Sequence, residues 1–237
     1  MIYFIKFQKS QELRDRIAGY AIPDKPATGL FLPQVIMNSV SDLPRLELHV
    51  APENLPLYTT VLQGGVLIEA RAGMSLGSFL DALPGFDHDY IVNEIQTIFL
   101  NGTAIDDLET PLEGDHPILA LSAAMPGLAG AILRRNSFHA ALRTTVTERR
   151  DHHHQGSITI TLKLFNSIAR DCGPALLAEG IRLDSGVLRV FRTTHPTLAA
   201  GLGQIVLDGR PITAATLSTW LDHDRIIVLI VREAAND

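Results

Sequence analysis

The chain has 237 residues, 46% of them apolar and 19% charged, so it is long enough to bury a substantial core and to form two small domains. Its net charge of -6 offers no broad basic surface for phosphates, which excludes nucleic acid as an expected partner. The single cysteine, Cys172, cannot form an internal disulfide. A disulfide scaffold is therefore excluded, and a reducing compartment, the cytoplasm, is expected.

The first residues predict a strand rather than a targeting signal. The apolar run MIYFI lacks a basic start and a small-residue cleavage site, and charged residues follow it at once. Residues 1–45 are rich in proline and match no other part of the chain. We expect them to form an N-terminal extension, with an extra strand and a helix (SQELRDRIAGY), packed on the first domain.

Residues 46–142 read as the first domain. The run GVLIEA at residues 65–70 predicts a strand, and Ser75 is a suitable N-cap for a following helix. Four apolar residues of that helix share one face, which indicates packing on a core; they are Leu76, Phe79, Leu80 and Leu83.

Two segments of the chain resemble each other and indicate an internal repeat. The sequence IFLNGTAI at residues 98–105 aligns with IVLDGRPI at residues 205–212. Further on, LEGDH and LDHDR each precede an apolar run. An apolar run that ends in Asn-Gly or Asp-Gly predicts a strand that enters a tight turn, because these residues tolerate a positive φ. We therefore expect Asn101-Gly102 and Asp208-Gly209 to occupy equivalent hairpins.

The second copy is expected at residues 157–237, after a polar linker at residues 143–156. It begins with the alternating strand ITITLKLF, and a short helical turn is expected at residues 166–173. Asp184 or Ser185 is a suitable cap for the helix GVLRVFRTT, which has to end near Pro196 because proline cannot continue the backbone hydrogen bonds. The predicted fold class is α+β, with two tandem units that each pack a mixed sheet on a helix.

The second copy resembles the sulfur-carrier β-grasp proteins of molybdopterin and thiamine biosynthesis, the MoaD/ThiS group of the ubiquitin-like superfamily. The resemblance lies in the opening strand ITITLKLF, the short helical turn, the hairpin after an apolar strand and the final strand after a Gly-Asp-like turn. The first copy is similar in TPLEGDHPILAL followed by AAMPGLAG, which corresponds to a final strand and a tail that contains proline and glycine. The resemblance implies two β-grasp units in tandem.

In that family the chemistry depends on a flexible terminal Gly-Gly, whose carboxylate is adenylated and converted to a thiocarboxylate by a partner enzyme. Here the second copy ends in REAAND, and the first continues beyond Gly130 into AILRR. We therefore expect a non-catalytic binding or adaptor protein, without a cofactor and with a protein partner. The alternative is the precursor of a sulfur carrier, in which cleavage after Gly130 exposes a tail for an adenylating or sulfur-transfer enzyme of cofactor biosynthesis.

The most apolar stretch, residues 117–133, is at the short limit for a membrane span and is interrupted by proline and glycine, so no membrane helix is expected. The segment PGLAGAILRRNSFHAAL at residues 126–142 predicts a helix with an apolar face. This helix either docks on its own sheet or forms a surface for a partner or a second subunit, with the arginines facing carboxylates. The residues of this candidate surface or tail are Pro126, Gly127, Leu128, Gly130, Ile132, Arg134 and Arg135.

A further alternative is metal binding by His152, His153 and His154 in the linker. Adjacent histidines on an extended segment point in different directions, so other ligands would be needed. Cys172 has no evident base beside it and is interpreted as structural. Carboxylates near the two hairpins are interpreted as turn residues rather than as acid–base pairs, and no catalytic residue is predicted; they are Asp106, Asp107, Glu109, Asp222 and Asp224.

Overall fold

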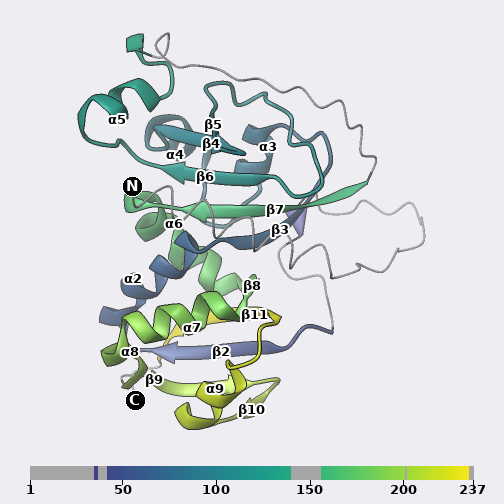
Figure 1. Ribbon diagram of the computed structural model, residues 1–237, viewed down its shortest axis with the longest axis vertical. Helices are drawn as coiled ribbons and strands as arrows, with labels where there is room; N and C mark the ends of the chain where they lie inside the picture. The colour runs from purple at the N-terminus through teal and green to yellow at the C-terminus, as the bar shows by residue number, and fades with distance from the viewer. Residues whose placement is uncertain (1–34, 37–41, 140–155, 201, 235–237) are drawn as a thin grey trace. The chain divides into compact units, whose positions relative to one another are not determined.

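The computed structural model describes residues 35–36, 42–139, 156–200 and 202–234, and the statements below refer to these ranges. They form an α+β fold (Figure 1). The strands are β1 (Val35–Ile36), β2 (Arg45–Val50), β3 (Val66–Arg71), β4 (Thr97–Leu100), β5 (Thr103–Ala104), β6 (Ile118–Ser122), β7 (Ser157–Leu164), β8 (Ile181–Asp184), β9 (Leu202–Leu207), β10 (Arg210–Pro211) and β11 (Ile226–Glu233).

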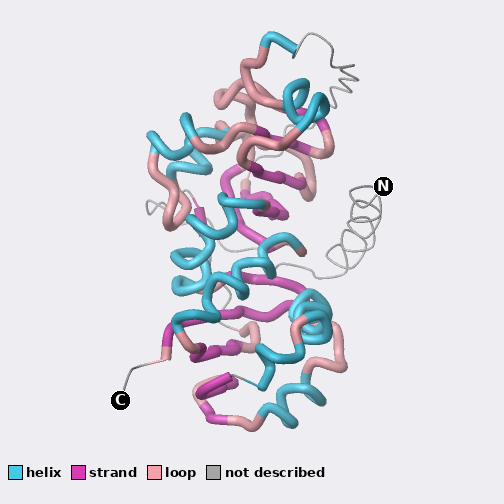
Figure 2. The backbone as a smooth tube through the Cα atoms, turned by 90° about the vertical axis from the view of Figure 1, so that its left-hand side faces the viewer, coloured by secondary structure: helices cyan, strands magenta, loops and turns pink. Residues whose placement is uncertain are grey.

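The helices lie between these strands in the chain, as the tube in Figure 2 shows. Two of them, η1 (Pro52–Asn54) and η2 (Thr59–Gln63), are 3₁₀ helices. The α-helices are α2 (Leu55–Tyr58), α3 (Leu76–Asp81), α4 (His88–Asn93), α5 (Gly127–Leu133), α6 (Asn166–Glu179), α7 (Ser185–Thr194), α8 (Pro196–Ala200) and α9 (Ala214–Trp220).

The strands form one mixed sheet in the order β10-β9-β2-β11-β8-β3-β7-β6-β4-β5, and β1 pairs with β3. The sheet consists of two half-sheets with the same pattern of strand directions. The first half-sheet is β3-β7-β6-β4-β5 and the second is β8-β11-β2-β9-β10. In each, one parallel pair (β7 with β6, β11 with β2) lies between antiparallel neighbours, and a short hairpin forms the outer edge.

The two halves of the chain exchange strands. β7 lies in the first half-sheet, where residues Val66–Arg71 of β3 pair with it on one side and β6 on the other. β2 lies in the second half-sheet, between β9 and β11. The domains expected at residues 46–142 and 157–237 therefore share one sheet. The first contributes β2 to the second half-sheet, and the second contributes β7 to the first half-sheet.

The half-sheets join where Leu67 of β3 pairs with Arg182 of β8. Here Arg182 Nη1 lies 2.6 Å from Glu69 Oε1, and both side chains are buried. Arg182 Nε also donates to the carbonyl oxygen of Leu67, at 3.4 Å. A buried charge requires a partner of opposite charge, so this ion pair compensates two groups that would otherwise oppose folding.

The predicted hairpins are confirmed. Asn101 and Gly102 connect β4 to β5 with φ of 51° and 84°, and Asp208 and Gly209 connect β9 to β10 with φ of 49° and 77°. Two consecutive positive φ angles are what a two-residue type I′ turn requires, and Asn-Gly and Asp-Gly supply them at low cost. The side chains also fix the neighbouring strands, because Asn101 Oδ1 accepts from the Ile118 backbone nitrogen at 2.9 Å.

The predicted helix starts are confirmed as well. Ser75 Oγ accepts from the Ser78 backbone nitrogen at the start of α3, at 3.3 Å. Asp184 caps α7 through the Gly186 nitrogen, at 2.7 Å, and α7 ends at Thr194, before Pro196. Each cap satisfies a backbone donor that has no partner within its own helix.

The helix after β7 is longer than predicted. It was expected to be a short turn at residues 166–173, but α6 continues through Pro174 to Glu179. Packing supplies the physical reason, since α6 lies against β6, β7, β11 and η2 and so covers strands of both half-sheets. Gly173 allows the close approach to η2: a Cβ there would lie 2.9 Å from the Thr59 Cβ and from Leu62 Cδ1.

One hydrophobic core runs through the described ranges. Alternate residues of β7 belong to it, as predicted: Ile158, Ile160, Leu162 and Leu164 are all buried. The residues between them, Thr159, Thr161 and Lys163, are buried too, so the strand is covered on both faces. Within the described ranges, no helix is long and apolar enough to cross a membrane, and the apolar stretch at residues 117–133 forms β6 and α5.

Candidate partner-binding surface

The chain leaves the first half-sheet at the end of β6 and turns into α5, at the place where the sequence predicts a surface or a tail. Pro126 has an extended backbone, with ψ of 158°, and Gly127 has φ of 79°. These conformations redirect the chain out of the strand and into the helix. We call residues 126–139 the α5 segment.

Arg135 attaches the α5 segment to the first half of the protein. Its Nη1 donates to the carbonyl oxygens of Ile91 and Ile95, at 3.2 and 3.0 Å, at the end of α4. Its backbone nitrogen donates to the Gln96 carbonyl oxygen at 2.7 Å. These carbonyls lie in and just after α4, where the last carbonyls of a helix have no partner within it. The arginines were expected to face carboxylates, and the Asp106 carboxylate acts on the charge of Arg135 in addition to these carbonyls.

The charge of Arg135 is not fully solvated. Partial burial lowers the pKa of its guanidinium, and the carboxylate of Asp106 opposes that effect. Asp106 Oδ1 also accepts from the Asn136 backbone nitrogen at 3.1 Å. After α5, Ser137 Oγ donates to the Ala131 carbonyl oxygen at 2.6 Å. These contacts hold the residues that follow the helix in one conformation.

Gly130 lies in the middle of α5 and is buried. A Cβ at this position would collide with the carbonyl oxygen of Met125. The glycine is therefore explained by close packing of the helix against the preceding turn. The Gly130 carbonyl oxygen accepts from the Arg134 backbone nitrogen at 3.0 Å, so the peptide group after Gly130 is part of the helix.

Two large apolar side chains of the α5 segment face solvent. Leu128 is 70% exposed and Phe138 is 94% exposed. The Phe138 ring lies edge-on to His139, with ring centroids 5.7 Å apart. Covering these two side chains would remove apolar area from water, which is a favourable change.

The structure divides the residues predicted for this surface into three groups. Pro126, Gly127, Leu128 and Arg134 are exposed, and Ile132 and Arg135 are half-buried, whereas Gly130 is buried. The segment is thus attached through Arg135 and exposed at Leu128 and Arg134. Phe138 was not predicted. Its signal was a single aromatic residue in the polar run RRNSFH, just after the helix.

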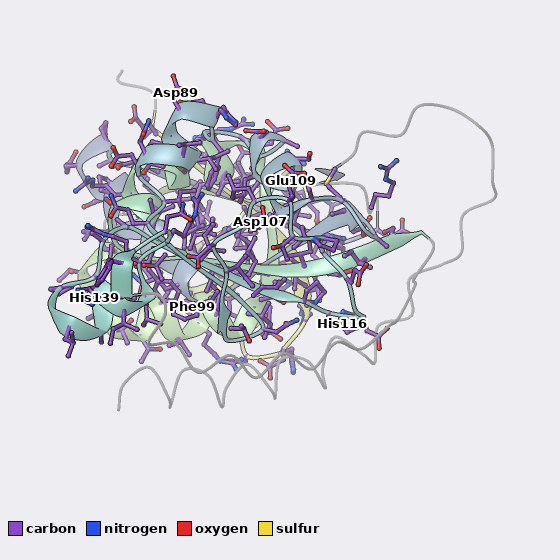
Figure 3. All side chains as sticks on the ribbon, turned by 90° about the horizontal axis from the view of Figure 1, so that it is seen from above. Asp89, Phe99, Asp107, Glu109, His116 and His139 are labelled. Atoms are coloured by element: carbon purple, nitrogen blue, oxygen red, sulfur yellow. The ribbon has the colours of Figure 1, made fainter. Side chains whose placement is uncertain are left out.

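The predicted histidine metal site, His152, His153 and His154, lies outside the described residues. Among the residues that are described, no group of three or more histidine, cysteine, aspartate or glutamate side chains could hold a metal ion. His116 and His139 lie far from each other in Figure 3, and Asp107 and Glu109 lie near neither of them.

The carboxylates near the hairpins have structural partners. Asp107 Oδ1 accepts from the Glu109 backbone nitrogen at 2.9 Å, which is a local turn contact. Asp224 Oδ1 lies 2.7 Å from Arg189 Nη2. The Asp107 contact agrees with the interpretation as a turn residue, whereas Asp224 pairs with an arginine of α7.

Cys172 lies in α6 and is 1% exposed. Burial raises the pKa of its thiol to about 12, the Asp171 and Asp87 carboxylates add to the rise, and the hydroxyl of Tyr90 opposes it. Tyr90 in turn donates to Asp171 Oδ2 at 3.0 Å, and burial raises its own pKa. A nucleophilic cysteine needs the opposite environment, so Cys172 is a core residue.

Comparison of the chain with protein-family models, with curated proteins and with solved structures gave no match.

Proposed function

We propose that this protein is a non-catalytic binding protein, built on a duplicated fold like that of the sulfur carriers, and that the α5 segment is its contact surface for a protein partner. The observation that carries the proposal is the exposure of Leu128 and Phe138 on a segment whose backbone is fixed. A fixed apolar surface loses little conformational entropy on binding, so much of the free energy of burying these side chains is available for affinity.

The β-grasp likeness belongs to the same proposal. Each half-sheet is mixed, has one parallel pair and ends in the same type of hairpin, which supports two related units. The position of Gly130 argues against use of the tail as a carrier in the intact chain. Activating enzymes of that family act on an extended terminal glycine, whereas Gly130 is a buried residue inside α5.

The experiment is site-specific photocrosslinking in the cells that produce the protein. A photoreactive phenylalanine analogue is placed at residue 138 or 128, and at Val190 of α7 as a control, because Val190 is also an apolar helix residue and is 53% exposed. We expect one product of discrete mass from positions 128 and 138 and none from position 190. The product from position 128 should be lost when Phe138 is replaced by serine, and the product from position 138 when Leu128 is replaced by serine. Tm should change little in both cases, since exposed substitutions rarely cost more than about 0.5 kcal/mol.

Equal labelling from all three positions, or none from 128 and 138, contradicts the proposal. A second arm tests the carrier alternative: the intact protein and, separately, a chain that ends at Gly130 are incubated with ATP and a sulfur-carrier activating enzyme, and their masses are measured. We expect no acyl-adenylate and no exchange of sulfur for oxygen. Either modification would favour the carrier function over the binding function.

A further inference from the structure

The exchange of β2 and β7 leads to an inference that goes beyond the proposed function and does not rest on it. Without β7, the first half-sheet would have an open position between β3 and β6, because β7 pairs with both. Without β2, the second half-sheet would have an open position between β9 and β11. Each half of the chain therefore carries a strand and an acceptor position that are complementary to the other half.

These acceptor positions do not depend on which chain supplies the strand. The pairings of β7 and β2 involve backbone hydrogen bonds and the burial of side chains such as Leu162 and Leu48, which are 0% and 1% exposed. A second copy of the chain offers the same groups. We propose that this protein can assemble with a second copy of itself by reciprocal exchange, with the β2–α5 half of one chain completed by the β7–β11 half of the other.

The connection between the halves decides which arrangement forms. β6 and β7 are parallel, so the chain has to return from the end of β6 to the start of β7. The starting point of this return is fixed by two backbone hydrogen bonds. The Arg135 nitrogen donates to the Gln96 carbonyl oxygen, and the Gln96 nitrogen donates to the carbonyl oxygen of Ser122, the last residue of β6. Its end is Ser157, the first residue of β7.

The distance to be covered follows from the length of β7. The Phe165 nitrogen donates to the Leu121 carbonyl oxygen, so the end of β7 lies beside the end of β6. Ser157, where β7 begins, is eight residues before Phe165 and lies at the opposite end of the strand. At a rise of about 3.3 Å per residue this is roughly 26 Å, and a path around packed strands is longer. Removal of residues 140–155 would leave five residues between Arg135 and Ser157, which span at most about 22 Å.

With Arg135 docked as it is, a chain shortened in this way cannot reach its own acceptor position, whereas that of a second copy is open to it. With the natural connection, the two halves of one chain meet at an effective concentration on the order of millimolar, so dilute protein is expected to be a monomer. The length of the connection thus selects between exchange within a chain and exchange between chains.

The experiment compares three full-chain proteins by size-exclusion chromatography with light scattering: the natural chain, the variant lacking residues 140–155, and a control in which these residues are replaced by a Gly/Ser segment of equal length. We expect the mass of a monomer for the natural chain and the control, and the mass of a dimer for the shortened variant. Addition of Leu128→Ser/Phe138→Ser to the shortened variant should leave its dimer intact, which separates exchange from association through the α5 segment.

A folded, monomeric shortened variant, whatever its Tm, would overturn the proposal. If the shortened variant is insoluble, the natural chain is unfolded in urea and refolded either dilute or at its highest soluble concentration. The concentrated sample should contain a dimer that separates only on unfolding. A monomer at every concentration would overturn the proposal in that case.

Discussion

Burial determines the role of the individual polar side chains in this protein. Arg182 and Glu69 are charged and buried at the junction of the half-sheets, and their 2.6 Å contact compensates their desolvation. Glu47 and Arg232 form a longer contact, 3.3 Å, and are more exposed, so that pair contributes little to stability. Burial raises the pKa of the Cys172 thiol, and the opposing effect of the Tyr90 hydroxyl is smaller. The thiol is therefore inert.

The raised pKa of Cys172 predicts a dependence of stability on pH. The thiol titrates near 9.0 in the unfolded chain and near 12 in the folded one, so between these values the folded state binds more protons. The contribution of Cys172 is fully present below pH about 9 and is lost as the pH rises toward about 12. The Cys172→Ala variant lacks this loss of stability. Tyrosines still titrate in the variant, among them Tyr58, because burial raises the pKa of Tyr58 to about 12.

The measurement is the free energy of unfolding in urea at pH 8 and at pH 10.5, for the natural chain and for Cys172→Ala. We expect a larger decrease with pH in the natural chain. In the folded protein at pH 8, iodoacetamide should label Cys172 only at the rate of unfolding. Equal decreases in both proteins, together with rapid labelling, would place the thiol in an exposed environment.

Local sequence signals predicted the elements that depend on local interactions. The Asn-Gly and Asp-Gly turns, the Ser75 and Asp184 caps and the break at Pro196 each involve a few neighbouring residues, and each is found in the structure. The end of α6 was missed because packing against strands of both half-sheets outweighs the presence of Pro174. Likewise, the docking of α5 depends on the Arg135 contact with Ile91 of α4, 44 residues away in the chain.

Gly130→Ala tests the role assigned to the α5 glycine. The added methyl group has to displace α5 from the Met125 carbonyl oxygen, so the α5 segment should loosen while the sheet remains folded. Limited proteolysis should then cut residues 126–139 several-fold faster than in the natural chain, with Ala129→Ser as the control because Ala129 is exposed. An unchanged cutting rate would show that the glycine is not required for packing.

The arrangement of the whole molecule depends on which strands pair, and the sequence did not indicate it. The alternation in ITITLKLF predicted one buried face, which is correct, but Thr159, Thr161 and Lys163 are buried as well. An alternating pattern specifies the faces of a strand and not its neighbours, so it cannot distinguish a strand in its own unit from one exchanged into the other. The repeat was visible in the hairpins, whereas the exchange of β2 and β7 was not.

The two halves of the chain build one sheet by exchanging β2 and β7. The most direct measurement is the behaviour of the full chain after it is cut at a protease site inserted between residues 140 and 155. We expect the cut protein to elute as one species with the mass of the intact chain and to unfold in a single transition, because both halves remain paired through β2 and β7. Separation of the two pieces as folded monomers under native conditions would contradict it.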